Sequence, residues 1–343
     1  IVAEVPLPLV HSMIARIKIM SGIDTTGLPR PLEGNMKFVH NNRKLDLRVS
    51  IFPTSYGECI VMRILESVKE YGNYEKLGFT REQSVLVSDT IGRPYGLVLV
   101  TGPTGSGKTV SLYTCLNILN KDGVNISTAE DPSEINLPGV NQVNVNEKAG
   151  LTFAAALKAF LRQDPDVIMV GEIRDLETAD ISIKAAQTGH MVLSTLHTND
   201  APTTLTRMMN MGIPTFNIAS SVILITAQRL ARRLCANCKE PLDVPRKALL
   251  DAGYKAEELD GTWTPYKPVG CSACNNGYKG RVGIYQVMPI SEEIQRIILR
   301  GGSALDIAKQ ASAEGVRTLR ESGLLKVKQG VTSLDEVLSV TNE

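Results

Sequence analysis

The chain has 343 residues, of which 43% are hydrophobic and 21% are charged, and its formal net charge is +1. This length allows two or three domains with separate cores, and the composition is ordinary for a globular protein. The balanced charge excludes a global electrostatic attraction to nucleic acid or acidic lipid.

No apolar run approaches the roughly 18 residues that a membrane span needs, and no secretory signal is evident, so we expect a cytoplasmic protein. The chain begins at Ile1 within sequence that already has the pattern of a folded domain. We therefore expect it to be a fragment of a longer protein.

The first 70 residues predict a small α+β domain. Residues 8–20 have helical periodicity, and "LDLRVSIFPTSYGECIVMRILE" (45–66) predicts two strands around a Pro-Thr-Ser-Tyr-Gly turn. A charged connector at 67–78 then indicates a domain boundary, with the linker itself at 71–78.

Two arginines, Arg48 and Arg63, lie inside these strand-like apolar stretches. Burying a guanidinium without an anion is costly, so each needs a partner. The partner is either a carboxylate of Asp46, Glu58 or Glu66, or a phosphate to which the arginines are delivered as fingers.

Residues 79–234 alternate short apolar strands with amphipathic helices, which predicts an α/β core with a largely parallel sheet covered by helices. The predicted strands are "LVLVT", "NISTA", "NQVNV", "DVIMVG" and "MVLSTL", and the predicted helices cover 108–120, 152–162, 176–188, 201–211 and 216–233.

A phosphate-binding loop stands between the first of these strands and its helix. The match to the Walker A pattern comprises Gly102, Pro103, Thr104, Gly105, Ser106, Gly107, Lys108 and Thr109. Glycines let backbone N–H groups curl around phosphate oxygens, and the helix N-terminus favours negative charge. We expect ATP here, with Lys108 on the β- and γ-phosphates and the Thr109 hydroxyl on Mg²⁺. The strand and helix on either side disfavour a chance match.

An acidic partner follows the strand "DVIMVG". Glu172 comes at its carboxyl end, where open α/β sheets bind ligands, and can orient magnesium or the attacking water. The alternative is a strand-end surface glutamate. The neighbouring Arg174 and Asp175 are interpreted as caps of the next helix.

Further candidates follow two other strands. Glu130, Asp131 and Glu134 cluster in "STAEDPSE", and such carboxylates repel one another unless cations lie nearby. Glu130 is best placed to polarise water, and the alternative is a solvated turn. His197 and, less favourably placed, His190 bracket "MVLSTL" and are either γ-phosphate contacts or structural histidines.

Four cysteines form two Cys-x-x-Cys pairs separated by 32 residues. The pairs are Cys235 with Cys238 and Cys271 with Cys274. Two such pairs with Gly/Asn-rich surroundings favour a closed tetrahedral zinc site of structural type, the alternative being a thiol–disulfide motif. We therefore expect a zinc subdomain at 235–290, weak in periodicity but with a small helix in "VPRKALLDAG", and short helices at 291–343. The isolated Cys59 and Cys115 are interpreted as core thiols.

In this order, "GPTGSGKT", "TAEDPSE", "VGEIRD" and "TGHMVLSTLHTND" resemble the Walker A, Asp box, Walker B and His box of the secretion-superfamily hexameric ATPases. The resemblance covers essentially the whole chain. It implies a RecA-like P-loop NTPase core preceded by a PAS-like N2 domain that carries arginines toward the nucleotide. Catalytic roles are then implied for Glu130, Glu172, His197, Arg48 and Arg63.

The resemblance also implies an ATP-driven molecular motor. The cysteine module favours the assembly and secretion branches of this family over the retraction motors. The pilus-assembly ATPases are the better match, with type II secretion ATPases as the alternative. A homohexamer on the cytoplasmic face of the inner membrane would hydrolyse ATP and move a pilus platform protein. Regulators would bind through the family's larger N-terminal region, which lies outside this sequence.

A nucleic-acid motor with a zinc ribbon is the rival from another class. It needs a basic or aromatic-lined strand path, whereas aromatic residues make up 5% of this chain. The basic cluster "QRLARRL" (228–234) is expected near a helix C-terminus, where the dipole favours cations. We therefore expect no nucleic-acid partner. A non-enzymatic zinc scaffold would leave the phosphate loop unexplained.

Overall fold

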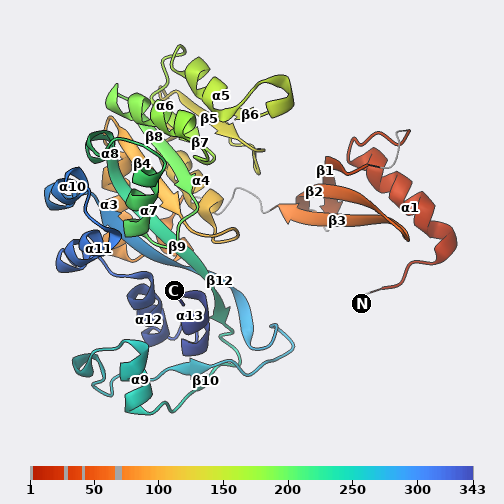
Figure 1. Ribbon diagram of the computed structural model, residues 1–343. Coiled ribbons are helices and arrows are strands. Elements are labelled where there is room, and N and C mark those ends of the chain that lie inside the picture. Colours follow the sequence, from red (N-terminus) through yellow and green to blue (C-terminus); the bar gives the residue numbers. More distant parts are fainter. Residues whose placement is uncertain (1–2, 27–29, 41–42, 66–71, 343) are drawn as a thin grey trace. The chain divides into compact units, whose positions relative to one another are not determined.

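The computed structural model describes residues 3–26, 30–40, 43–65 and 72–342 (Figure 1). These fall into two units, the first comprising residues 1–70 with 134–136 and the second the remainder. Part of the predicted connector at 67–78, and of the linker at 71–78, lies outside the described residues. Within the described part of the chain, none of the helices has the length and apolarity that a membrane crossing requires.

The N-terminal unit is one helix on a three-stranded antiparallel sheet. Helix α1 is followed by strands in the order β1-β2-β3. The bounds are α1 Leu7–Met20, β1 Leu32–His40, β2 Arg43–Thr54 and β3 Gly57–Leu65. Successive residues of β2 point to opposite faces, so Val49 and Ile51 share one face, where they are buried in a core that also contains Met36. The predicted helix and two strands are confirmed, and β1 was not predicted.

The second unit is built on a seven-stranded sheet in the order β12-β9-β4-β8-β7-β5-β6. All neighbouring strands are parallel except β12 and β9. The bounds are β4 Gly96–Thr101, β5 Ile126–Glu130, β6 Asn141–Asn144, β7 Val167–Val170, β8 Met191–Leu196, β9 Val222–Leu234 and β12 Tyr278–Pro289. The five predicted core strands are confirmed, as is the mixed α/β architecture with a central parallel sheet.

Helices connect these strands and begin at residues that cap their first turns. Thr152, Asp175 and Asp200 each accept a hydrogen bond from a backbone N–H of the helix that follows, which satisfies donors otherwise left without a partner. The bounds are α2 Tyr74–Leu77, α3 Arg81–Ile91, α4 Lys108–Leu119, α5 Phe153–Phe160, α6 Leu176–Gln187, α7 Ala201–Asn210 and α8 Thr215–Ser221, with a 3₁₀ turn at Glu147–Ala149.

The predicted helix at 216–233 is wrong. Helix α8 ends at Ser221, and β9 then runs from Val222 to Leu234 between β4 and β12. Leu224 and Ile225 point to opposite faces of the sheet and both are fully buried, so the strand has no polar face to give an alternating pattern. Periodicity alone does not separate such an apolar run from a buried helix. The basic cluster at 228–234 therefore lies on a strand and not near a helix C-terminus.

The cysteine-containing segment is also more regular than predicted. Its last part, β12, pairs with β9 over Tyr278–Pro289 and belongs to the central sheet. The small helix expected between the cysteine pairs is confirmed as α9. The remaining bounds are α9 Arg246–Ala252, a 3₁₀ turn at Ala256–Glu258, and the paired short strands β10 Glu240–Pro241 and β11 Tyr266–Lys267. A separate zinc subdomain at 235–290 stays a prediction.

The predicted short helices after residue 291 are confirmed as α10 to α13 (Figure 1). Their bounds are α10 Glu292–Leu299, α11 Ala304–Ala313, α12 Leu319–Lys328 and α13 Leu334–Val340. Helix α13 is joined to β9 by Glu336, which accepts hydrogen bonds of 2.9 Å from both the backbone N–H and the Nε of Arg232. The guanidinium also lies over the Tyr278 ring, 4.1 Å from its centroid.

We expect Glu336→Ala to lower the free energy of unfolding by roughly 2–3 kcal/mol at pH 7, because the Arg232 backbone and side chain lose their shared acceptor. Burial acts to raise the pKa of Glu336, but the Arg232 hydrogen bonds and charge outweigh it and hold the pKa below its usual range. The stabilisation is therefore present above the unfolded pKa of about 4.3 and is lost as pH falls through the lower folded value.

Urea unfolding at pH 7 and at pH 3 measures this. Glu293→Ala is the matched control, because it breaks an exposed pair with Arg296 and should cost less than about 0.5 kcal/mol. Equal losses in the two variants, or a difference between wild type and Glu336→Ala that grows on acidification, would contradict the assignment.

Candidate functional site

The predicted site residues of the core meet at one edge of the sheet. In the parallel register Thr101 of β4 pairs with Leu196 of β8, and Val170 of β7 pairs with Ser194 of β8 and Ala129 of β5. The carboxyl ends of four strands therefore lie side by side. Glu130 is the last residue of β5, and Glu172 and His197 lie in the loops after β7 and β8. The loop after β4 leads to Lys108, the first residue of α4.

The loop between β4 and α4 has the backbone that only glycine adopts readily. Gly102 has φ 145° and Gly107 has φ 90°. A Cβ atom at Gly102 would also lie 2.5 Å from the carbonyl oxygen of Gln228 and 2.6 Å from Ser106 Oγ. Gly102 is therefore required by close packing as well as by its backbone conformation, and Gly107 by its backbone conformation.

Polar atoms in and beside this loop fit an anionic ligand. The hydroxyls of Thr101 and Ser106 are buried and find no hydrogen-bond partner among the described residues. Helix α4 begins at Lys108, so its first N–H groups and its dipole face the loop. Such a set of donors suits phosphate oxygens.

Lys108 folds back over the loop. Its Nζ donates to the carbonyl oxygens of Gly102 at 2.8 Å and Pro103 at 3.1 Å. Burial lowers the pKa of Lys108, and the charge of Glu172 partly opposes this shift. The ammonium therefore lies within electrostatic reach of Glu172, and a phosphate beside it would favour its charged form.

Glu172 stands at the centre of a charged network. Its Oε1 accepts from Arg174 Nε at 2.6 Å, and its Oε2 lies 3.3 Å from His197 Nε2. Arg174 also reaches Asp131 at 3.3 Å. Arg174 is therefore not a helix cap, contrary to prediction, whereas Asp175 does cap α6 by accepting from Thr178 N at 2.7 Å. Walker B and His box candidates are thus in contact.

Glu130 is held inside the protein. It is 4% exposed, and its carboxylate accepts hydrogen bonds from Tyr113, from Thr128 Oγ1 at 2.7 Å and from Gln142 Nε2 at 3.0 Å. The alternative of a solvated turn therefore does not hold for Glu130. Its three donors also link helix α4 to the neighbouring strands β5 and β6, which sequence reasoning did not anticipate.

His190 lies at the other edge of the sheet. It precedes β8, whereas His197 follows it, and its Nδ1 contacts the carbonyl oxygen of Ala185 at 3.0 Å. The structure does not bring His190 to the phosphate loop, which favours a structural role for it.

The two predicted arginines lie opposite each other in the N-terminal unit. Arg48 on β2 is the register partner of Arg63 on β3, and the strands leave Arg48 half-exposed and Arg63 exposed. Arg48 Nη2 pairs with Glu33 Oε2 at 2.8 Å, and Glu33 was not among the carboxylates considered. Of the carboxylates considered, Glu58 pairs instead with Lys18 at 2.8 Å, and Glu66 lies outside the described residues.

The four paired cysteines come together as predicted. All four sulfurs lie within 4.8 Å of one another. The Cys235–Cys271, Cys238–Cys274 and Cys271–Cys274 sulfur distances are 3.9, 3.7 and 3.6 Å. A tetrahedron with Zn–S bonds of about 2.3 Å has S···S edges of about 3.8 Å, whereas a disulfide bond is about 2.05 Å long. The cluster fits a zinc ion and is not disulfide-bonded.

The isolated cysteines differ from each other. Cys115 is buried and accepts a hydrogen bond from the Tyr74 hydroxyl at 3.3 Å, as expected of a core thiol. Cys59 is exposed, so its assignment to the core was wrong. It lies in β3 as the register partner of Phe52, which is also exposed, because this face of the sheet is not covered by α1.

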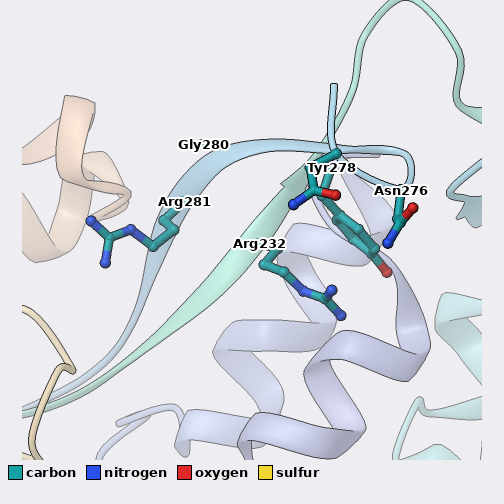
Figure 2. Close-up of a pocket in the computed structure, with 6 residues that line it drawn as sticks. Arg232, Asn276, Tyr278, Gly280 and Arg281 are labelled. Atoms are coloured by element: carbon teal, nitrogen blue, oxygen red, sulfur yellow. The ribbon is translucent and has the colours of Figure 1, made fainter. Parts of the chain in front are cut away.

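A pocket of about 310 Å³ is lined by residues of β9, of β12 and of the turn that follows Cys274 (Figure 2). Its lining includes Arg232, Asn276, Tyr278 and Arg281. In Figure 2 the Arg281 side chain points away from the other three, and Arg232 is bonded to Glu336. The polar groups of this pocket do not converge on one point, so it is a weaker candidate than the phosphate loop.

Sequence reasoning missed one residue at the loop. Gln228 of β9 is 1% exposed and donates from Nε2 to the Ser106 carbonyl oxygen at 2.7 Å. A glutamine within the apolar run "VILITAQRLA" is the available signal. It was hidden because that run was interpreted as a helix.

Comparisons with known proteins identify the family of the chain. A family model described as "Type II/IV secretion system protein" matches residues 2–339. The type IV pilus assembly ATPase PilB of Pseudomonas aeruginosa is 57% identical over 343 residues, which are 100% of this chain and 60% of that protein. The type II secretion system protein E of Aeromonas hydrophila is 43% identical over 336 residues, which are 98% of this chain and 66% of that protein.

A solved structure described as the pilus retraction motor PilT with bound ADP is 27% identical, with a TM-score of 0.66, over 91% of this chain and 78% of that one. The chain spans about 60% of the length of the pilus assembly relative. The resemblance to secretion ATPases inferred from the ordered motifs is confirmed.

We expect the purified protein to contain about one zinc ion per chain, because four thiolates at tetrahedral spacing form a closed site. Cys238→Ser should remove most of the metal and lower the unfolding temperature, since binding free energy at such sites contributes to folding. Cys59→Ser, exposed and outside the cluster, is the control and should leave the metal content unchanged. A metal-free protein of normal thermal stability would refute the site.

Proposed function

This chain belongs to the type II/IV secretion system protein family, and we propose that it is the motor part of an ATPase that powers type IV pilus assembly. The observation that carries the proposal is the phosphate loop with Glu172 and His197 in contact on the adjoining strand ends. The 57% identity to a pilus assembly ATPase supports the choice within the family.

The roles of the core residues follow from their positions. Residues 102–109 bind the phosphates of ATP, Lys108 neutralises the β- and γ-phosphates, and Thr109 holds Mg²⁺. Glu172 orients magnesium or the attacking water, and its contact with His197 supports a role for this histidine beside the γ-phosphate. Glu130 acts from its buried position at the end of β5. The ion supplies charge stabilisation when bound.

Larger elements of the proposal rest on the resemblance. The second unit contains a RecA-like core, and residues 1–70 form a PAS-like N2 domain that delivers Arg48 and Arg63 to a nucleotide. Six copies form a ring at the cytoplasmic face of the inner membrane and move a platform protein there. The four cysteines hold a structural zinc ion that contributes no open coordination position.

Type II secretion is the second candidate, supported by the 43% identity to a type II secretion system protein E. Complementation separates the two. A strain lacking its pilus assembly ATPase should regain pili when the residues of this chain replace the corresponding part of that enzyme. Restored secretion through a type II system without restored pili would favour the second candidate.

Lys108→Ala should weaken ATP binding by roughly 30- to 150-fold, because a charge-assisted contact to the phosphates is lost. Titration with a fluorescent ATP analogue measures the dissociation constant. His190→Ala is the control, since His190 lies at the opposite edge of the sheet. Unchanged affinity in Lys108→Ala would exclude the loop as the nucleotide site.

Glu172→Gln should bind ATP with near-normal affinity but hydrolyse it at least about 100-fold more slowly, because the carboxylate that orients water or magnesium is lost. Phosphate release at saturating ATP, measured beside the binding titration, separates the two steps. Full hydrolysis by Glu172→Gln would show that the Walker B assignment is wrong.

A further inference from the structure

We propose that Gln228 of β9 is a positioning residue that holds the phosphate loop in the conformation that accepts a nucleotide. The inference deepens the proposed function and rests on it, because it concerns the same loop. Gln228 itself touches the loop and not the phosphates, and it comes from a strand about 120 residues further along the chain.

Both polar atoms of the Gln228 side-chain amide form hydrogen bonds. Its Nε2 donates to the Ser106 carbonyl oxygen at 2.7 Å, and its Oε1 accepts from Ser111 Oγ at 2.8 Å. Ser106 lies in the loop, and Ser111 lies one turn inside α4. One buried amide therefore joins the loop to the helix that follows it.

Backbone packing adds to these contacts. A Cβ atom added at Gly102 would lie 2.5 Å from the Gln228 carbonyl oxygen. A Cβ atom added at Gly107 would lie 3.3 Å from Gln228 Nε2. Two glycines of the loop thus face Gln228, one toward its main chain and one toward its side chain. The phosphate loop therefore packs closely against Gln228.

The orientation of one peptide unit gives these contacts a consequence for binding. In a trans peptide the C=O and N–H groups point in opposite directions. Because Gln228 holds the Ser106 carbonyl toward β9, the N–H of Gly107 is turned away from β9. The Gly107 N–H meets no acceptor among the described residues, so it is free to donate to a phosphate oxygen.

A glutamine at this position is costly unless both ends of its amide are satisfied. Gln228 is 1% exposed, and burying an unpaired amide is unfavourable. Leucine or methionine would fill the space without that cost. We therefore infer that the amide of Gln228 is needed for its hydrogen bonds to the loop and not for packing in the core.

The test compares Gln228→Met with wild type in the full chain. Methionine keeps the length of the side chain but forms neither hydrogen bond. We expect both the dissociation constant and the KM for ATP to rise about tenfold, with kcat changed less than about threefold, because bound phosphate restores the loop at saturation. A residue that only stabilises the fold would lower the active fraction, and so kcat, without changing KM.

Gln286→Met is the matched control. Gln286 is a glutamine of the adjacent strand β12, 5% exposed, whose Oε1 accepts from the Ala201 backbone N–H at 2.9 Å. Its removal should lower the unfolding temperature but leave the KM for ATP unchanged. An equal rise in KM for Gln286→Met would overturn the inference, because the effect would then follow from any buried glutamine.

Ser111→Ala provides a second test if Gln228→Met does not fold. It removes one of the two amide contacts and should raise the dissociation constant for ATP by about threefold. Unchanged affinity in the folded variants overturns the positioning role while wild-type ATP binding leaves the proposed function intact. A wild-type chain that binds no ATP would instead refute the proposed function.

Discussion

Parallel pairing of β5, β7, β8 and β4 is the constraint on which the candidate site depends. It aligns four strand ends at one edge, so residues at or after these ends are brought together although 94 residues lie between Gly102 and His197. A strand of opposite direction in this set would carry its polar residue to the far edge, where His190 lies. The direction of the strands therefore decides whether these side chains can meet in one site.

Local spacing explains why much of the site could be predicted. The phosphate loop, Glu172 and His197 each follow an apolar strand directly, and such strand-end positions are readable without knowledge of distant contacts. Gln228, Tyr113 and Gln142 could not be found in the same way, because each acts on a residue distant in sequence. The first half of β9 is buried on both faces and lacked the alternation that distinguishes a strand, so the type of this element was misassigned and Gln228 was missed with it.

The surroundings of charged side chains were harder to predict from the sequence than the motifs. The arginines at 48 and 63 were expected to be buried, but β2 and β3 turn them to the face that α1 does not cover, where Glu33 from β1 is the neighbour of Arg48. Choosing among carboxylates requires the strand register, which one sequence does not contain. The cysteine cluster was easier to predict, because the ligands of one metal ion must lie close together whatever the fold of the residues between them.

Strand β9 carries Gln228 beside the phosphate loop, and Cys235 directly follows its last residue. Both ends of this short stretch are thus anchored, one by the loop and one by the cysteine cluster. A one-residue insertion between them would turn every intervening side chain to the other face of the sheet, and neither end is free to shift and absorb it. The residues between these anchors, 229–234, should therefore tolerate changes of residue type better than changes of length.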